Sequence, residues 1–282
     1  KELNANAVHT HHIGPLLYAG LAARLAGIKH LIHTEHDAWH LMKYKRRTLQ
    51  RWAIKLLQPT LAADAATVAN IMRMQLRCSN DITVIQNGID TEHFIPGDSS
   101  IARQCLKLPP QAKIIGCSGR LEQVKGQSVL IHALSQLSPS VHLAFAGTGT
   151  TEARLRDLVD QLNLTTRVHF LGRIDNMPVF YQALDVFCLP SLSEGFPLAP
   201  LEAQACNIPT VVTNVGGSQE TLCPHSGELI PANNSNIMAD TLANMLQNLS
   251  GRQPRKFVQQ NGDIRLMVKA YATLRDAGAA YA

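Results

Sequence analysis

Short apolar runs alternate with helix-forming segments along most of this sequence, and this alternation constrains the fold more than any other feature. Strands are predicted at a run ending at residue 8 and at 29–33, 60–69, 82–85, 113–117, 141–145, 168–172, 185–190, 210–213 and 227–230. Helices are predicted at 16–26, 43–57, 70–78, 127–137, 151–162, 177–183, 200–206, 236–249 and 263–277. Consecutive strands that are joined through a helix pair in parallel. The sequence therefore predicts an α/β protein with parallel sheets.

The length of 282 residues suggests two domains. We predict residues 1–94 as a first α/β domain and 95–262 as a second, with a turn at 87–90 near the junction. Residues 263–282 are predicted to hold a C-terminal amphipathic helix. The composition, 45% apolar and 17% charged, is typical of a globular protein with a full core. No apolar run approaches the ~20 residues that a transmembrane helix needs.

The stretch Ser191–Glu202 joins the strand at 185–190 to the next helix. Glu194 is expected in the loop beyond the strand, and Glu202 in the first turn of the helix. In open α/β sheets ligands bind at this edge, where a helix N-terminus also favours anions such as a diphosphate. Carboxylates accept hydrogen bonds from sugar hydroxyls. Taken singly, each glutamate is more typical of an ordinary strand–loop–helix joint, in which one glutamate is favoured by the helix dipole and the other is solvated.

With Gly195, Phe196, Pro197 and Leu198 between the glutamates, the stretch resembles the signature of the retaining GT-B glycosyltransferases of family 4 (glycosyl transferases group 1). The resemblance implies two Rossmann-like domains with a cleft between them, a C-terminal helix that crosses back to the first domain, and a first domain that is incomplete at its start. It implies that Glu194 contacts the transferred sugar, that Glu202 contacts the ribose, and that the residues between them complete the donor site.

Two cations lie in the loop after the strand at 113–117, in the run Gly119-Arg120 … Lys125-Gly126. They are placed to hold a diphosphate and to stabilise it as a leaving group. Alone, the run is more typical of a basic surface loop, but together with Glu194 and Glu202 it resembles the family, which has the same run in its diphosphate site. The remaining expected donor contacts follow two later strands, at Gly147 and at Arg173 and Ile174; an exposed, uninvolved Arg173 is the alternative.

Histidines gather in His9-x-His11-His12 and His33-x-x-His36-x-x-x-His40, and three interpretations stay open for them. His9, His11, His33 and His36 are candidate metal ligands of a metal-dependent hydrolase. Histidines at strand ends are also often simply hydrogen-bonded. The family resemblance implies instead that His11 helps to position the transferred sugar, and that no metal or other cofactor is needed.

A basic segment follows the second histidine group, with Lys43, Lys45, Arg46, Arg47, Arg51 and Lys55 and no acidic residue between them. Trp39 and Trp52 lie alongside, which suits the surface of an anionic membrane. A solvated basic helix that covers a core edge is the alternative. No nucleic-acid-reading motif accompanies the charge, so we expect no nucleic acid partner. The six cysteines form no C-x-x-C pair and are predicted to be reduced core residues.

These observations together predict a cytoplasmic enzyme, at the inner face of the cytoplasmic membrane through its basic segment. It would transfer a sugar from a nucleotide-sugar donor to a sugar or lipid-linked acceptor hydroxyl, with retention, in surface polysaccharide or glycolipid assembly. Arg120, Lys125, Glu194 and His11 are the expected catalytic residues. The alternatives are the hydrolase and a non-catalytic nucleotide-binding fragment.

Overall fold

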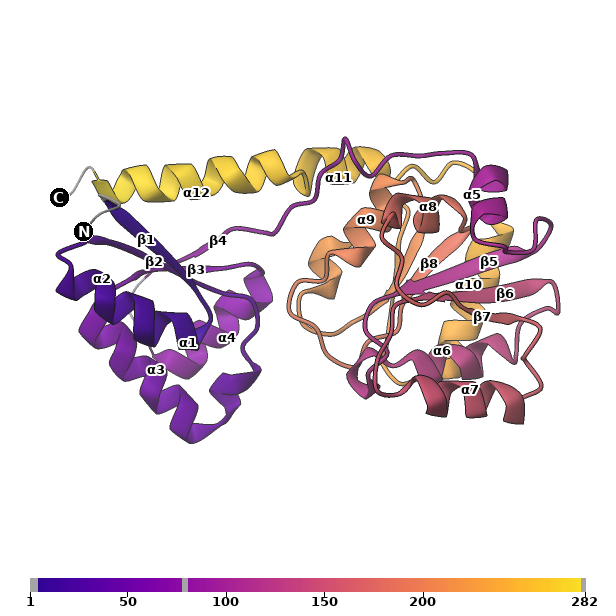
Figure 1. The fold of residues 1–282 in the computed structure, drawn as a ribbon, viewed down its shortest axis with the longest axis horizontal. Coiled ribbons are helices and arrows are strands. Elements are labelled where there is room, and N and C mark those ends of the chain that lie inside the picture. The colour runs from indigo at the N-terminus through magenta and orange to yellow at the C-terminus, as the bar shows by residue number, and fades with distance from the viewer. Residues whose placement is uncertain (1–4, 78–80, 280–282) are drawn as a thin grey trace. The chain divides into compact units, whose positions relative to one another are not determined.

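The computed structural model describes residues 5–77 and 81–279 and divides the chain into two compact units (Figure 1). The first unit runs to Gly88 and takes up the chain again from Ile264, and the second is Ile89–Asp263. Each unit is a parallel sheet covered by helices, which confirms the predicted α/β class. None of the helices within the described ranges has both the length and the apolar character that crossing a membrane requires.

The first unit contains a parallel sheet with its strands in sequence order, β1-β2-β3-β4. The strands are β1 (Ala7–His11), β2 (His30–Glu35), β3 (Thr60–Ala63) and β4 (Ile82–Val84). In the register of β1 and β2, Thr10 lies opposite His33 and His11 opposite Thr34. Alternate side chains of a strand point to opposite faces. His9 and His11 therefore share one face of the sheet, and His33 lies on the other.

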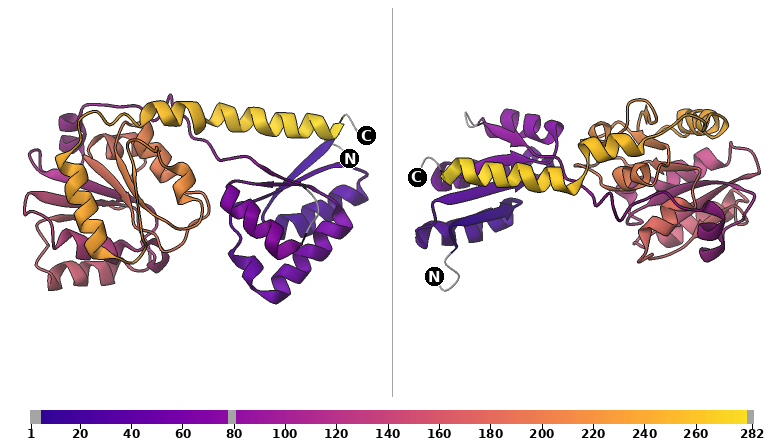
Figure 2. Two further views of the ribbon diagram at one scale, coloured as in Figure 1. Left: turned by 180° about the vertical axis from the view of Figure 1, so that it is seen from behind. Right: turned by 90° about the horizontal axis from the view of Figure 1, so that it is seen from above.

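Helices cover both faces of this sheet (Figures 1 and 2). One face carries a continuous helical segment made of α1 (Ile13–Pro15), a π-helical turn (Leu16–Gly20) and α2 (Leu21–Leu25), with α3 (Tyr44–Leu57) and α4 (Ala66–Leu76) beside it. A short 3₁₀ turn, Trp39–Met42, precedes α3. The other face is covered by α12 (Ile264–Ala279), whose Tyr271 hydroxyl lies 3.1 Å from the Thr34 hydroxyl of β2.

The second unit contains a six-stranded parallel sheet in the order β10-β9-β8-β5-β6-β7. Its strands are β5 (Lys113–Ser118), β6 (Val141–Ala146), β7 (Val168–Phe170), β8 (Val186–Leu189), β9 (Thr210–Thr213) and β10 (Glu228–Ile230). The chain builds outward from β5 to one edge, then returns to pair β8 with the other side of β5. The order of strands thus reverses between β5 and β8, where open α/β sheets bind ligands.

Two hydrophobic cores hold the helices of the second unit against its sheet. Helices α6 (Gln127–Leu134), α7 (Glu152–Gln161) and α10 (Ser235–Gln247) contribute to one core. Helices α5 (Ser99–Cys105), α8 (Met177–Gln182) and α9 (Ala199–Ala205) contribute to the other, and α11 (Arg255–Asn261) packs beside α9. The four central strands, β5, β6, β8 and β9, are nearly fully buried, which explains their continuous apolar runs.

Several elements differ from the sequence-based expectation. Strand β1 runs through His11, because its pairing with β2 continues to the Thr34 position, so His9 and His11 lie in the strand and His12 follows it. Helix α4 begins at Ala66, not at residue 70. Helices α5 and α11 were not predicted; the N-cap of α5 is Asp98, whose side chain accepts from two backbone N–H groups. Cys105 is exposed, unlike the buried Cys117, Cys188, Cys206 and Cys223, and Cys78 lies outside the described residues.

The segment just after Gly88 packs with the second unit, six residues before the expected boundary at residue 94. The Ile89 N–H donates to the Gly262 carbonyl at 2.9 Å, and the Thr91 hydroxyl donates to the Asp263 carboxylate. The Arg255 guanidinium of α11 donates to the carbonyls of Thr91 and Phe94. These contacts, made by residues far apart in sequence, place 89–94 within the second unit.

A matched pair of glycines tests how tightly the loops of this sheet are packed. Gly126 and Gly172 have φ angles of 65° and 67°, and an alanine at either one pays the left-handed backbone cost of about 1–2 kcal/mol. At Gly172 the new Cβ meets open space, whereas at Gly126 it overlaps the Pro190 carbonyl. We expect Gly126→Ala to lower the free energy of unfolding by about 1–3 kcal/mol more than Gly172→Ala. Urea denaturation measures both, and equal losses would contradict this packing.

Candidate active site

The loops at the carboxyl edge of the second sheet are joined to one another by backbone hydrogen bonds. The Leu192 N–H, after β8, donates to the Val124 carbonyl in the β5 loop at 2.8 Å. The Gly217 N–H, after β9, donates to the Gly195 carbonyl at 2.7 Å. Because these bonds tie together segments from different strands, the side chains on this edge have fixed positions relative to one another.

Lys125 and Glu194 form an ion pair in the middle of this edge. The Lys125 Nζ donates to Glu194 Oε1 at 2.7 Å, and the Ser191 hydroxyl donates to the same oxygen at 2.6 Å. Glu194 is only 8% exposed, whereas the Lys125 side chain is 23% exposed. The loop after Glu194 buries Phe196 and leaves Leu198 exposed. The ammonium group therefore neutralises a largely buried carboxylate at a place that solvent still reaches.

Glu202 lies in the first turn of α9, as predicted, and is held by a buried tyrosine. The Tyr181 hydroxyl donates to Glu202 Oε2 at 2.5 Å and lies 3.0 Å from the Ser118 hydroxyl of β5. Burial raises the pKa of Glu202, and the hydrogen bond from Tyr181 offsets only part of this effect. Burial and the neighbouring Glu202 raise the pKa of Tyr181 well above its usual value. The phenol is therefore the donor of this pair.

The other predicted donor residues lie on the same edge of the sheet with more exposure. Arg120 is exposed at the end of β5, and its carbonyl accepts from the Gln127 side chain. The Gly147 N–H donates to the Gly172 carbonyl at 2.7 Å, which connects the loops after β6 and β7. Arg173 pairs with Asp175 at 3.2 Å, and both side chains are almost fully exposed. Ile174 is half-buried against the core.

Two hydrogen-bonded networks hold the histidines of the first unit. On one sheet face, His11 Nδ1 lies 2.7 Å from His36 Nε2, and His36 Nδ1 lies 3.1 Å from the Asp64 carboxylate. On the other, His33 Nε2 lies 3.1 Å from the buried Glu35 carboxylate. Burial alone would raise the pKa of Glu35, but hydrogen bonds with His12 and His33 lower it to about 2.

The four candidate metal ligands are thus divided between the two faces of the sheet. Within residues 5–77 and 81–279, no three histidine, cysteine or acidic side chains are grouped so that they could hold a metal ion. Burial and the neighbouring imidazoles lower the pKa of His9 to about 4, so His9 is neutral at ordinary pH. The geometry favours hydrogen-bonded histidines over the hydrolase alternative.

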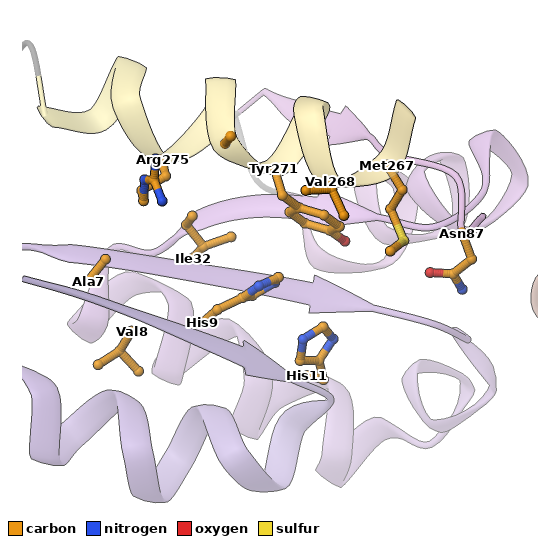
Figure 3. Close-up of a pocket in the computed structure, with 11 residues that line it drawn as sticks. Ala7, Val8, His9, His11, Ile32, Asn87, Met267, Val268, Tyr271 and Arg275 are labelled. Carbon is orange, nitrogen blue, oxygen red and sulfur yellow. The ribbon is translucent and has the colours of Figure 1, made fainter. Parts of the chain in front are cut away.

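A pocket of about 510 Å³ lies beside the first of these networks, between β1 and α12 (Figure 3). His9 faces Tyr271 of α12, with ring centroids 4.8 Å apart, and His11 and Asn87 also line the pocket. His11 belongs to the first unit, and the predicted donor residues belong to the second.

Several residues that hold the predicted ones in place carry no clear signal in the sequence. Ser191 lies in the predicted stretch, but nothing in the pattern indicates that its hydroxyl donates to Glu194. Tyr181 reads in sequence as an ordinary apolar residue of α8, and Asp64 follows a short strand without any motif. Their roles come from contacts with residues 3 to 28 positions away, and only the parallel sheet brings the more distant ones together.

Comparisons with known protein families match both units. The family model described as glycosyl transferases group 1 matches residues 98–262. A second model, described as glycosyltransferase family 4, matches residues 1–93. The lipopolysaccharide core biosynthesis mannosyltransferase LpsB of Rhizobium meliloti is 36% identical over 57% of this chain and 49% of its own length. The D-inositol 3-phosphate glycosyltransferase of Stackebrandtia nassauensis is 30% identical over 84% of this chain and 59% of its own. The chain thus spans about half the length of the curated relatives it matches.

Solved structures agree on the fold. The Anabaena protein HepE, solved in complex with UDP, matches 95% of this chain and 78% of its own with a TM-score of 0.86 and 22% identity. A glycosyltransferase from Rickettsia africae matches 99% of this chain and 78% of its own with a TM-score of 0.88 and 21% identity. These likenesses confirm the predicted GT-B fold class.

The buried phenol beside Glu202 gives a test of the local electrostatics. Replacing Tyr181 by phenylalanine removes the donor to the carboxylate, so we expect the pKa of Glu202 to rise further above its usual value. A carboxyl-carbon NMR titration of the labelled protein measures this shift. Ser118→Ala is the matched control, because it leaves the contact between Tyr181 and Glu202 in place. An unchanged titration in Tyr181→Phe would show that the phenol does not stabilise the carboxylate.

Proposed function

We propose that this chain, which belongs to the family of glycosyl transferases group 1, transfers a sugar from a nucleotide-sugar donor to an acceptor hydroxyl with retention at the anomeric carbon. The observation that carries the proposal is the set of Lys125, Glu194 and Glu202 on one hydrogen-bonded edge of the second sheet. It lies at the strand-order reversal, where nucleotide ligands bind in open α/β sheets.

Each of these side chains suits a different part of a nucleotide sugar. Glu202, held by Tyr181, has its second carboxylate oxygen available to accept from ribose hydroxyls. Lys125 meets solvent beside Glu194 and is placed to bind a diphosphate oxygen. Glu194 is then the acceptor for hydroxyls of the transferred sugar. Its burial and its bond from Ser191 keep it fixed while these contacts form.

The proposed catalysis rests on charge that develops as the glycosidic bond breaks. The departing diphosphate gains negative charge. Cations already in place therefore stabilise the transition state more than they stabilise the bound substrate. Lys125 is held in place by Glu194, and Arg120 is exposed on the same loop. In this proposal the two cations take the part that a metal ion has in other transferases, and the leaving phosphate accepts the proton of the acceptor hydroxyl. No metal or other cofactor is required.

The named relatives support particular substrates for a first test. HepE has been solved with UDP and with UDP-glucose, so uridine diphosphate is the first nucleotide to try. LpsB is named for lipopolysaccharide core biosynthesis, which supports an acceptor in surface polysaccharide or glycolipid assembly. The D-inositol 3-phosphate glycosyltransferases support a small phosphorylated acceptor as the alternative.

Calorimetry of uridine diphosphate binding tests the nucleotide site. We expect Glu202→Ala to weaken binding by about 1–3 kcal/mol, the value of a hydrogen bond to a charged group, or about 5- to 150-fold in Kd. Glu228→Ala is the control, since it removes an equally charged but exposed carboxylate in β10. If the affinities of Glu202→Ala and the parent are equal, Glu202 does not bind the ribose.

We also propose that α3 attaches the first unit to anionic membranes. Its exposed side chains combine the cations Lys45 and Lys55 with the aromatic Trp52, which is 65% exposed. Two of the six cations of the segment have structural partners instead: Arg47 donates to the Gln75 side chain, and Arg51 to carbonyls at the end of α4. The membrane interaction would therefore rest on the remaining four cations and the exposed apolar side chains.

Vesicle sedimentation tests this attachment. Each cation near an anionic surface contributes about 1 kcal/mol, so Lys45→Glu with Lys55→Glu should weaken binding by about thirtyfold or more. Arg154→Glu with Lys256→Glu makes the same change in net charge on exposed positions of the second unit and should leave binding nearly unchanged. Equal binding by both double variants, or binding that is indifferent to salt, would contradict an electrostatic attachment through α3.

A further inference from the structure

His11, His36 and Asp64 form a linear hydrogen-bonded chain at the carboxyl edge of the first sheet. His11 Nδ1 lies 2.7 Å from His36 Nε2, and the other nitrogen of His36, Nδ1, lies 3.1 Å from Asp64 Oδ2. The Asn87 amide also donates to Asp64 Oδ2 at 3.1 Å. The three chain members come from β1, from the loop after β2 and from the loop after β3. Asp64 is buried at one end, and His11 is exposed at the other.

The hydrogen bonds of this His11–His36–Asp64 chain all point the same way, because each link needs one donor and one acceptor. An ionised carboxylate only accepts, so His36 carries its proton on Nδ1 and presents a lone pair on Nε2. His11 must then carry its proton on Nδ1 and donate it to His36 Nε2. The remaining nitrogen of neutral His11, Nε2, is left with a lone pair.

We infer that His36 and Asp64 are positioning residues that hold His11 in its Nδ1–H tautomer, so that His11 Nε2 acts as a hydrogen-bond acceptor for a ligand hydroxyl. The inference rests on the proposed function only for the identity of that hydroxyl, which would belong to a sugar substrate. A histidine without this chain is free to exchange tautomers, and it would present a donor to the same group for much of the time.

The surroundings of His11 favour its neutral form. His9 lies beside it on β1, with ring centroids 4.2 Å apart, and His12 follows it in the chain. Burial, followed by the charges that His36, His12 and His33 would carry, lowers the pKa of His11. Tyr271 and Arg275 of α12 line the same pocket, and neither supplies a carboxylate that would favour a protonated His11 (Figure 3).

Nitrogen NMR of the full chain with labelled histidines tests the inference without any activity assay. The two ring nitrogens of a neutral histidine give separate signals according to which one carries the proton. At a pH of about 8, where ordinary histidines are neutral, we expect the Nδ1–H form of His11 to be favoured about tenfold, as one hydrogen bond of ordinary strength supports. His11→Gln, which lacks the signals, assigns them.

Two variants distinguish the effect of the hydrogen-bonded chain His11–His36–Asp64 from that of neighbouring groups. His36→Ala removes the acceptor of His11, so its tautomer ratio should fall by about tenfold. Tyr271→Phe removes a hydroxyl that contacts Thr34 in the same pocket, leaves the links of His11, His36 and Asp64 in place and should leave the ratio unchanged. His33, which is buried on the other face of the same sheet with its Nε2 3.1 Å from the Glu35 carboxylate, reports whether the first unit of a variant is still folded.

The outcomes of this experiment and of the function tests are distinguishable. A His11 that carries its proton on Nε2 in the parent protein overturns the inference, whether or not the protein binds a nucleotide. The Nδ1–H form in a protein that binds no nucleotide sugar leaves the tautomer established and counts against the proposed function. Where sugar transfer is measurable, His36→Ala should lower kcat more than it raises KM. If the variant acted only by unfolding part of the protein, the tautomer ratio of His11 in the folded fraction would be unchanged.

Discussion

The candidate active site depends on the close backbone packing of the loops at the carboxyl edge of the second sheet. Gly126 sits where any Cβ would overlap the Pro190 carbonyl, and Leu192 donates to the carbonyl of Val124. The loops after β5 and β8 therefore lie directly against each other, and Lys125 of the first donates to Glu194 of the second at 2.7 Å. A cation fixed in this way costs little reorganisation when a charged ligand arrives, which is the basis of electrostatic preorganisation.

The two units use the same physical principle with different chemistry. In the second unit, a buried donor, Tyr181, orients a carboxylate, and a hydroxyl, Ser191, orients another. In the first unit, a buried carboxylate, Asp64, orients an imidazole, which in turn orients His11. Glu194, Glu202 and His11 were predicted from the sequence as ligand contacts, whereas the buried Tyr181 and Asp64 were not. The buried partner fixes which atom of the outer group is free to meet a ligand.

The histidine-rich start of the chain shows how the number of candidate ligands can mislead. His9, His11, His33 and His36 are close in sequence and suggest a metal site, but strand alternation sends His33 to the opposite sheet face from His9 and His11. There His33 joins Glu35 and the buried Gln50, which donates to the same carboxylate at 2.6 Å. The expectation that β1 ended at Val8 hid this alternation, because a loop imposes no such separation of side chains.

The sequence by itself determined the α/β class, most of the strands and the order of the two units, because buried parallel strands need continuous apolar runs and helices need their own period. It also determined the placement of Glu194 after a strand and of Glu202 in a helix's first turn, since both follow from local pattern. Only the tertiary structure decided which partners these residues have. The contacts of Lys125 with Glu194 and of His36 with Asp64 join residues 69 and 28 positions apart. No local sequence pattern encodes such a pairing. The pairing depends on which strands are neighbours in the sheet and on how closely the loops that follow them approach each other.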